Sequence, residues 1–175
     1  MTKIISFVAG PSAGKSTMAG QLFGHMKQKR LNVEYVQEFA KDLTWKRSIS
    51  LDDQLYVLGN QHNRLYTLLG QVDYVVTDSP LFLSLHYAEK SLKKYQNSSD
   101  VKKAIEDLVL AVSDQLDETI YFVDRAERKF VQAGRNQNEA ESKLIDSSVI
   151  DLLKKHAKPF KVISNIKEVI KDLNV

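Results

Sequence analysis

The stretch Ala9-Gly10-Pro11-Ser12-Ala13-Gly14-Lys15-Ser16-Thr17 decides the fold of this 175-residue chain. It follows the run from Lys3 to Val8, whose β-branched and aromatic residues predict a buried strand. After it, Met18, Leu22 and Met26 recur at helical spacing, which predicts an amphipathic helix. A strand, a loop of small residues and a helix therefore follow one another at the start of the chain.

This order of elements is the context that a Walker A motif, a loop that binds nucleotide phosphates, requires. Small residues let backbone N–H groups close around an anion, and the start of the helix adds its positive end. Lys15 can reach the terminal phosphates, and the Ser16 hydroxyl can hold Mg²⁺. We therefore expect the nucleotide to contact Pro11, Ser12, Ala13, Gly14, Lys15, Ser16 and Thr17.

One position departs from the usual glycine pattern of this motif. Ala9 replaces its first glycine; alanine is small enough for the turn, and the neighbouring Gly10 can relieve the strain. The alternative interpretation is a chance Gly-Lys-Ser sequence at a helix start, and the strand and helix on either side argue against it.

Strands and helices alternate along the rest of the chain. Apolar runs predict strands over residues 32–36, 72–77, 119–123 and 160–163. Helical periodicity predicts helices over residues 51–69, 81–95, 101–116, 139–155 and 166–173. This alternation is typical of a three-layer α/β fold, with a parallel sheet between helices on both faces. The polar residues after the first three strands should meet at the carboxyl edge of the sheet, where ligands bind.

The composition is typical of a globular protein, with 43% hydrophobic and 27% charged residues. The length predicts one domain over residues 1–175. The chain has no cysteine, which excludes disulfides and thiolate metal sites. No apolar stretch is long enough for a membrane span, so we expect no membrane partner and a cytoplasmic location. The net charge of +3 suits an anionic substrate such as a nucleotide.

Two carboxylates follow strands that lead to this edge. Asp78 ends the third strand and could ligate Mg²⁺ or accept a proton from the substrate. With Ser79 and Pro80 it would also suit the start of a helix. Glu38 follows the second strand, where it could equally be a first-turn residue that complements a helix dipole.

These residues together resemble the small P-loop kinases, and among them the nucleoside and nucleotide kinases, including ribosylnicotinamide kinase-like and phage-type members. The resemblance rests on residues 10–17, Glu38, Asp78-Ser79-Pro80 and an arginine-bearing segment after the fourth strand. It implies a five-stranded sheet in the order 2-3-1-4-5, ATP and Mg²⁺ as cofactors, and a lid over about residues 124–136. It also implies that Glu38 is the general base for a substrate hydroxyl.

The segment after the fourth strand carries several arginines. Guanidinium groups can neutralise the charge that spreads over a phosphoryl group during transfer. We therefore expect Arg125 and Arg128 to act in catalysis, and Arg128 and Arg135 to contact the nucleotide. The alternative is a solvated basic loop, which is how most charged runs behave.

Residues between the second and third strands should select the acceptor. We expect Lys41 and Gln61 to contact it beside Glu38 and Asp78, because an amide on a helical face can read a base edge. A solvent-facing glutamine is the alternative. In Trp45-Lys46-Arg47, an aromatic ring that could stack on a base stands next to two cations that could pair with phosphates. The other interpretation of Trp45 is packing.

Three functions stay open on the sequence alone. The first is ATP- and Mg²⁺-dependent transfer of a γ-phosphate to a nucleoside or nucleotide. The second, implied by the phage-type resemblance, is phosphorylation of a hydroxymethylated pyrimidine in DNA, with DNA binding that weakens steeply with salt. The third is a regulatory module that binds ATP and transfers nothing. The helices between Tyr87 and Leu116 either form a homodimer face or cover the sheet.

We predict that Lys15→Ala abolishes phosphotransfer and leaves the fold intact, because it removes only the cation that meets the terminal phosphates. Transfer of label from γ-labelled ATP, measured beside circular dichroism, checks both parts. Full activity in the variant would contradict the phosphate-binding role of the loop.

Overall fold

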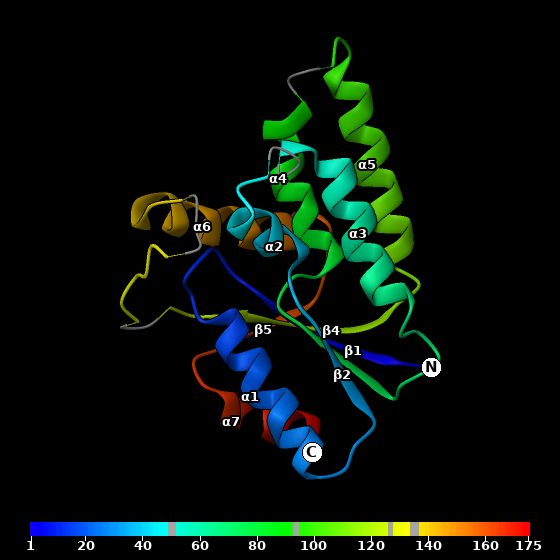
Figure 1. Cartoon of the computed structure of the whole chain (residues 1–175), viewed down its shortest axis with the longest axis vertical. Coiled ribbons are helices and arrows are strands. Elements are labelled where there is room, and N and C mark those ends of the chain that lie inside the picture. The colour runs from blue at the N-terminus through cyan, green and yellow to red at the C-terminus, as the bar shows by residue number, and fades with distance from the viewer. Residues whose placement is uncertain (49–51, 93–94, 126–127, 134–136) are drawn as a thin grey trace.

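The computed structural model describes residues 1–48, 52–92, 95–125, 128–133 and 137–175. Within these ranges a five-stranded sheet has helices on both faces (Figure 1). All neighbouring strands are parallel, and the order is β2-β3-β1-β4-β5. The fold class and strand order expected from the sequence are therefore confirmed. The strands are β1 (Lys3–Val8), β2 (Val33–Val36), β3 (Tyr74–Thr77), β4 (Asp117–Val123) and β5 (Phe160–Ile163).

Two layers of helices cover the sheet (Figure 1). One face carries α1 (Lys15–Gln28) and α7 (Ile166–Leu173). The other carries α3 (Gln54–Tyr66), α4 (Ser84–Ser91), α5 (Ser98–Ser113) and α6 (Glu139–Lys155). Among the helices of the described ranges, none has the length and apolar character needed to cross a bilayer.

The sequence predicts most element bounds to within a few residues, and those of α6, β5 and α7 without error. Both α6 and α7 begin at capping boxes, formed by Asn138 with Glu141 and by Asn165 with Glu168. Two short elements differ from the expectation. Helix α2 (Phe39–Trp45) follows β2, and a 3-10 turn, η2 (Leu81–Leu83), precedes α4. Residue 51, where the sequence predicts the start of the helix over residues 51–69, lies outside the described residues.

Strand β1 is the centre of the core. Ile4, Ile5, Phe7 and Val8 are each at most 1% exposed. Successive strand residues point to opposite faces, so both faces of β1 are covered, as is usual for parallel sheets. Complete burial of one such side chain contributes about 1.5–3 kcal/mol. The phosphate-binding loop therefore starts from the most firmly packed strand.

The strand register sets which residues meet at the carboxyl edge. Thr77 at the end of β3 pairs with Ser6 of β1 on one side and with Val36 of β2 on the other. The chain then leaves the sheet at neighbouring points, through Asp78 after β3 and through Gln37 and Glu38 after β2. The carboxylates predicted from the sequence are thus brought to the same edge as the loop after β1.

Candidate active site

The loop after β1 presents backbone N–H groups at the start of α1. Gly14 is the N-cap of α1, with φ of 103°, and the helix has neither a side-chain cap nor an acidic residue in its first turn. The first N–H groups of a helix have no partner within it, so they are available to an anion. Ser12 also has a positive φ, of 63°, and its hydroxyl oxygen accepts a hydrogen bond from Val131 N–H at 3.0 Å.

Arg128 lies against this loop. Its Nη1 donates to the carbonyl oxygens of Ala13, at 3.3 Å, and Asp124, at 2.6 Å, and its Nη2 donates to that of Ser164, at 2.7 Å. A Cβ at Gly14 would come within 3.1 Å of Arg128 Nε, in a backbone conformation that already favours glycine. The structure therefore places Arg128, one of the arginines predicted to bind nucleotide, beside the phosphate-binding loop.

The Lys15 side chain folds over the same loop. Its Nζ donates to the carbonyl oxygens of Ala9, at 2.9 Å, and Gly10, at 3.1 Å. Burial, and to a smaller extent the charge of Arg125, lowers the pKa of Lys15, while the negative charges of Glu38, Asp78 and Asp146 raise it. The charge of Lys15 is therefore favoured by carboxylates from three other parts of the chain.

Asp78 joins the ends of β2 and β3. It is 2% exposed, and its Oδ1 accepts a hydrogen bond from the Glu38 backbone N–H at 3.1 Å. Next to it, the Thr77 hydroxyl donates to the Val36 carbonyl oxygen at 2.8 Å and accepts from Ser79 N–H at 3.1 Å. These bonds fix the Asp78 carboxylate relative to the backbone of Glu38.

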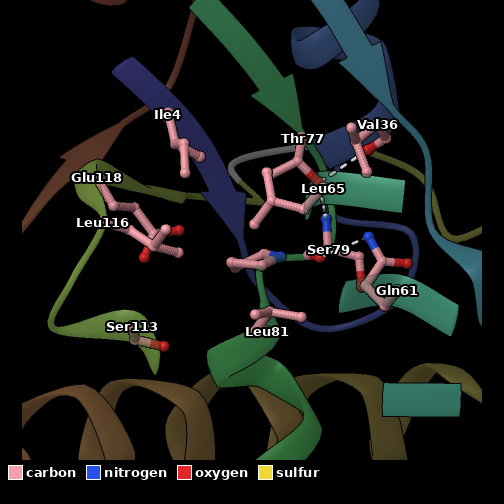
Figure 2. Close-up of a pocket in the computed structure, with 11 residues that line it drawn as sticks. Ile4, Val36, Gln61, Leu65, Thr77, Ser79, Leu81, Ser113, Leu116 and Glu118 are labelled. Carbon is pink, nitrogen blue, oxygen red and sulfur yellow. Dashed lines mark hydrogen bonds between the residues drawn. The ribbon is translucent and has the colours of Figure 1, made fainter. Parts of the chain in front are cut away.

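Gln61 differs from its predicted role as a contact to a base edge. It is 6% exposed, and its side-chain oxygen accepts from Phe39 N–H at 2.8 Å. Its amide nitrogen donates to the Ser79 carbonyl oxygen at 3.0 Å, and Figure 2 shows this amide pointing at Ser79. The amide thus bridges the two chain segments that carry Glu38 and Asp78. This position predicts that Gln61 supports the segments that carry Glu38 and Asp78. It differs from both interpretations made from the sequence, a contact to a base edge and a solvent-facing side chain.

A small pocket lies behind this bridge. Thr77, Ser79 and Gln61 form one side of it, and Glu118 on β4 lies on the other (Figure 2). The Ser6 hydroxyl donates to the Glu118 carboxylate, and burial raises the pKa of that carboxyl. The pocket lies beneath the carboxylate edge and is separate from the phosphate-binding loop.

Two tyrosines at the site were missed by the sequence analysis. The pKa of Tyr35 on β2 is raised, first by burial and then by the charge of Asp78. The pKa of Tyr87 on α4 is also raised, first by burial and then by the charges of Glu38 and Asp146. Neither residue lies in a motif, so no pattern in the sequence singles out these two phenols.

Three other predicted residues lie in different surroundings. Arg125 is expected from the sequence to face the phosphoryl group. In the structure it is paired with the Asp146 carboxylate, which the fold brings beside it from α6. Lys41 is exposed on α2, one turn after Glu38. Trp45 at the end of α2 is 64% exposed, which contradicts the packing interpretation. Arg135, the third predicted lid arginine, lies outside the described residues.

The site offers oxygen ligands that suit Mg²⁺. Ser16, an exposed residue, has a hydroxyl at the start of α1, and Asp78 has a carboxylate at the end of β3. Mg²⁺ binds through one or two carboxylates together with substrate phosphates and waters, and needs no cage made only of protein groups. The residues present therefore fit the ion that the sequence predicts.

The comparisons with known proteins agree with the fold. Residues 4–168 match the family described as AAA domain, so the chain belongs to that family. No curated protein sequence matches the chain.

Several solved structures share the fold. Thymidylate kinase from Ehrlichia chaffeensis is similar with a TM-score of 0.62 and 19% identity, over 99% of each chain. Deoxyadenosine kinase from M. mycoides with bound dATP has a TM-score of 0.60 and 15% identity, over 98% of this chain and 100% of that one. The same kinase with dCMP and dCDP bound has a TM-score of 0.61 and 14% identity, over 98% of each. The chain therefore has the fold of these kinases.

We predict that Gln61→Leu lowers the free energy of unfolding by about 1–3 kcal/mol, because the Phe39 N–H and the Ser79 carbonyl lose their partner. Urea denaturation measures this. The matched control is Gln21→Leu, an exposed glutamine on α1, which should change stability by less than about 0.5 kcal/mol. Equal stability of the two variants would show that the Gln61 bridge does not support the site.

Proposed function

We propose that the protein is an ATP- and Mg²⁺-dependent kinase that transfers the γ-phosphoryl group to a nucleoside or nucleotide acceptor. The observation that carries this proposal is that the loop with Lys15 and the strand ends with Glu38 and Asp78 lie at the same edge of the sheet, where the Glu38 N–H donates to Asp78 Oδ1 at 3.1 Å. Binding ATP alone would need only the loop. Carboxylates fixed opposite it provide what a second substrate requires, namely a proton acceptor and a metal ligand.

Each residue has a distinct role in the proposed reaction. Lys15 and the N–H groups at the start of α1 neutralise the charge on the phosphates. Glu38 accepts the proton of the acceptor hydroxyl. The acceptor oxygen then bonds to the γ-phosphorus, and the bond between the γ-phosphorus and the oxygen of the β-phosphate breaks, which releases ADP. Ser16 and Asp78 would hold Mg²⁺, which supplies additional neutralisation of the phosphate charge when bound.

The fold supports a nucleoside or nucleotide as the acceptor. The similar solved structures are a thymidylate kinase and a deoxyadenosine kinase, and the latter contains dATP in one structure and dCMP in another. In this chain the acceptor would lie between the loop and α2, above the Glu38–Asp78 contact. The exposed Lys41 would then lie one turn from Glu38, where it could meet an acceptor phosphate.

The exposure of Trp45 favours a second candidate, phosphorylation of a base in DNA. The indole is 64% exposed, one helical turn after Lys41 and next to the exposed Lys46 and Arg47. Helix α2 is seven residues long, so Trp45 lies about 10 Å along it from Glu38. Aromatic and basic groups so placed can stack on a base and neutralise phosphates of a strand.

We predict that label from γ-labelled ATP appears on one acceptor class in a panel of nucleosides, nucleoside monophosphates, nicotinamide riboside, and DNA with and without hydroxymethylated pyrimidines. Glu38→Gln should lower kcat on a hydroxyl acceptor at least tenfold, because the amide cannot take the proton. Glu34→Gln is the matched control on β2, where Glu34 pairs with Lys27 at 2.8 Å, and should stay within about twofold.

The panel also separates the alternatives. Label on DNA alone, with binding that falls steeply as salt rises, would favour the second candidate. ATP binding with no label on any acceptor would contradict the proposed kinase activity and favour a regulatory module. Near-normal turnover in both Glu38→Gln and Asp78→Asn would contradict the roles given to these carboxylates.

A further inference from the structure

Helix α6 contacts the phosphate-binding loop directly, at Gly10 and Pro11. The Gly10 N–H donates to Asp146 Oδ1 at 2.6 Å, and the Ser142 hydroxyl donates to the Pro11 carbonyl oxygen. Ser142 and Asp146 are one turn apart on the buried side of α6. Ser142 is fully buried, and the Asp146 side chain is only 16% exposed.

The contact is close enough to require glycine in the loop. A Cβ at Gly10 would clash with the Ser142 carbonyl oxygen, and it would lie 2.9 Å from Arg125 Nη2 and 3.0 Å from Asp146 Oδ1. The loop backbone is therefore packed on the backbone and polar side chains of α6. A small movement of the helix would have to move the loop with it.

Arg125 contacts both of these α6 residues. Its Nε is paired with Asp146 Oδ2, and its Nη2 donates to the Ser142 carbonyl, at 3.1 Å, and hydroxyl oxygens. The Arg125 side chain is 14% exposed. The negative charge of Asp146 alone would repel a polyphosphate bound to the loop. The Arg125 guanidinium offsets this negative charge and also holds Asp146 in place.

The same residue of the loop also holds the functional lysine. The N–H of Gly10 is bound by Asp146, and its carbonyl oxygen accepts from Lys15 Nζ at 3.1 Å. The position of the Gly10 backbone therefore links α6 to the lysine that faces the phosphates.

We propose that Asp146, held by Arg125 and Ser142, is a positioning residue that fixes the phosphate-binding loop and so sets its affinity for the polyphosphate of a nucleotide. Asp146 acts through Gly10, and Arg125 acts through Asp146 rather than on the transferred group. The inference rests on the proposed function only in taking a nucleotide as the ligand of the loop; it does not depend on the acceptor.

The test uses the full-length chain and two measurements. Calorimetry with Mg²⁺ and ATP, without acceptor, gives the Kd. Hydrogen exchange without nucleotide, followed over residues 10–17, reports the loop itself. The variants are Asp146→Ala, Arg125→Ala, the double variant and Asp146→Asn, with Asp151→Ala, on the exposed side of α6, as the control.

We expect Asp146→Ala and Arg125→Ala each to raise the Kd about tenfold or more and to speed exchange in the loop. The double variant should be little worse than either single one, because the two residues act as a unit. Asp146→Asn keeps an oxygen that can accept from the Gly10 N–H. Hydrogen exchange in the loop should therefore be slower in Asp146→Asn than in Asp146→Ala. Asp146→Asn also supplies the test if the alanine variant fails to fold. Asp151→Ala should leave both measurements unchanged.

Two results would overturn this inference and leave the proposed function standing. One is an unchanged Kd and unchanged exchange in folded variants at Asp146. The other is a loss of affinity in the double variant that equals the sum of the two single losses, with the larger loss from Arg125→Ala. This result would show that Arg125 acts on the nucleotide directly. A wild-type chain that binds no nucleotide would instead contradict the proposed function, and with it the effect of Asp146 on affinity.

Discussion

The Lys15 ammonium lies where the phosphate-binding loop, the ends of β2 and β3, and helix α6 come together, and the balance of charge around it constrains the whole site. Burial and the charge of Arg125 lower its pKa, and the carboxylates of Glu38, Asp78 and Asp146 raise it. Backbone N–H groups bind two of these carboxylates, from Glu38 to Asp78 and from Gly10 to Asp146. Each such bond stabilises a buried negative charge and at the same time fixes a neighbouring chain segment.

This arrangement explains how a nucleotide can enter a site that already contains three acidic groups. Arg125 offsets the charge of Asp146, and Arg128 places a second guanidinium against Ala13 and the start of α1. The N–H groups of the first turn of α1 add a partial positive charge. The acidic groups are thus held at the ends of β2 and β3 and on α6, and the positive groups lie at the loop, where polyphosphate charge would lie.

The sequence predicts the fold well because its strongest signals are local. The motif from Ala9 to Thr17 and the alternation of strands and helices specify a three-layer α/β fold, while the strand order came only from the family resemblance. The roles of Gln61 and Arg125 could not be predicted in this way, because their partners lie far away in the sequence. Gln61 binds Phe39 and Ser79, and Arg125 binds Asp146, 21 positions further along the chain. Polar residues inside an apolar helix stripe, such as Ser142 and Asp146, were the available sign that a helix met a polar site.

The most direct test of the account is a crystal structure of the full chain with Mg²⁺ and a non-hydrolysable ATP analogue. The account predicts that the triphosphate lies along residues 10–17 and that Lys15 Nζ leaves the carbonyl oxygens of Ala9 and Gly10 for the terminal phosphates. The bond from Gly10 N–H to Asp146 should remain. A triphosphate bound elsewhere, or a Lys15 side chain that stays on the loop carbonyls with the nucleotide present, would contradict the central claim.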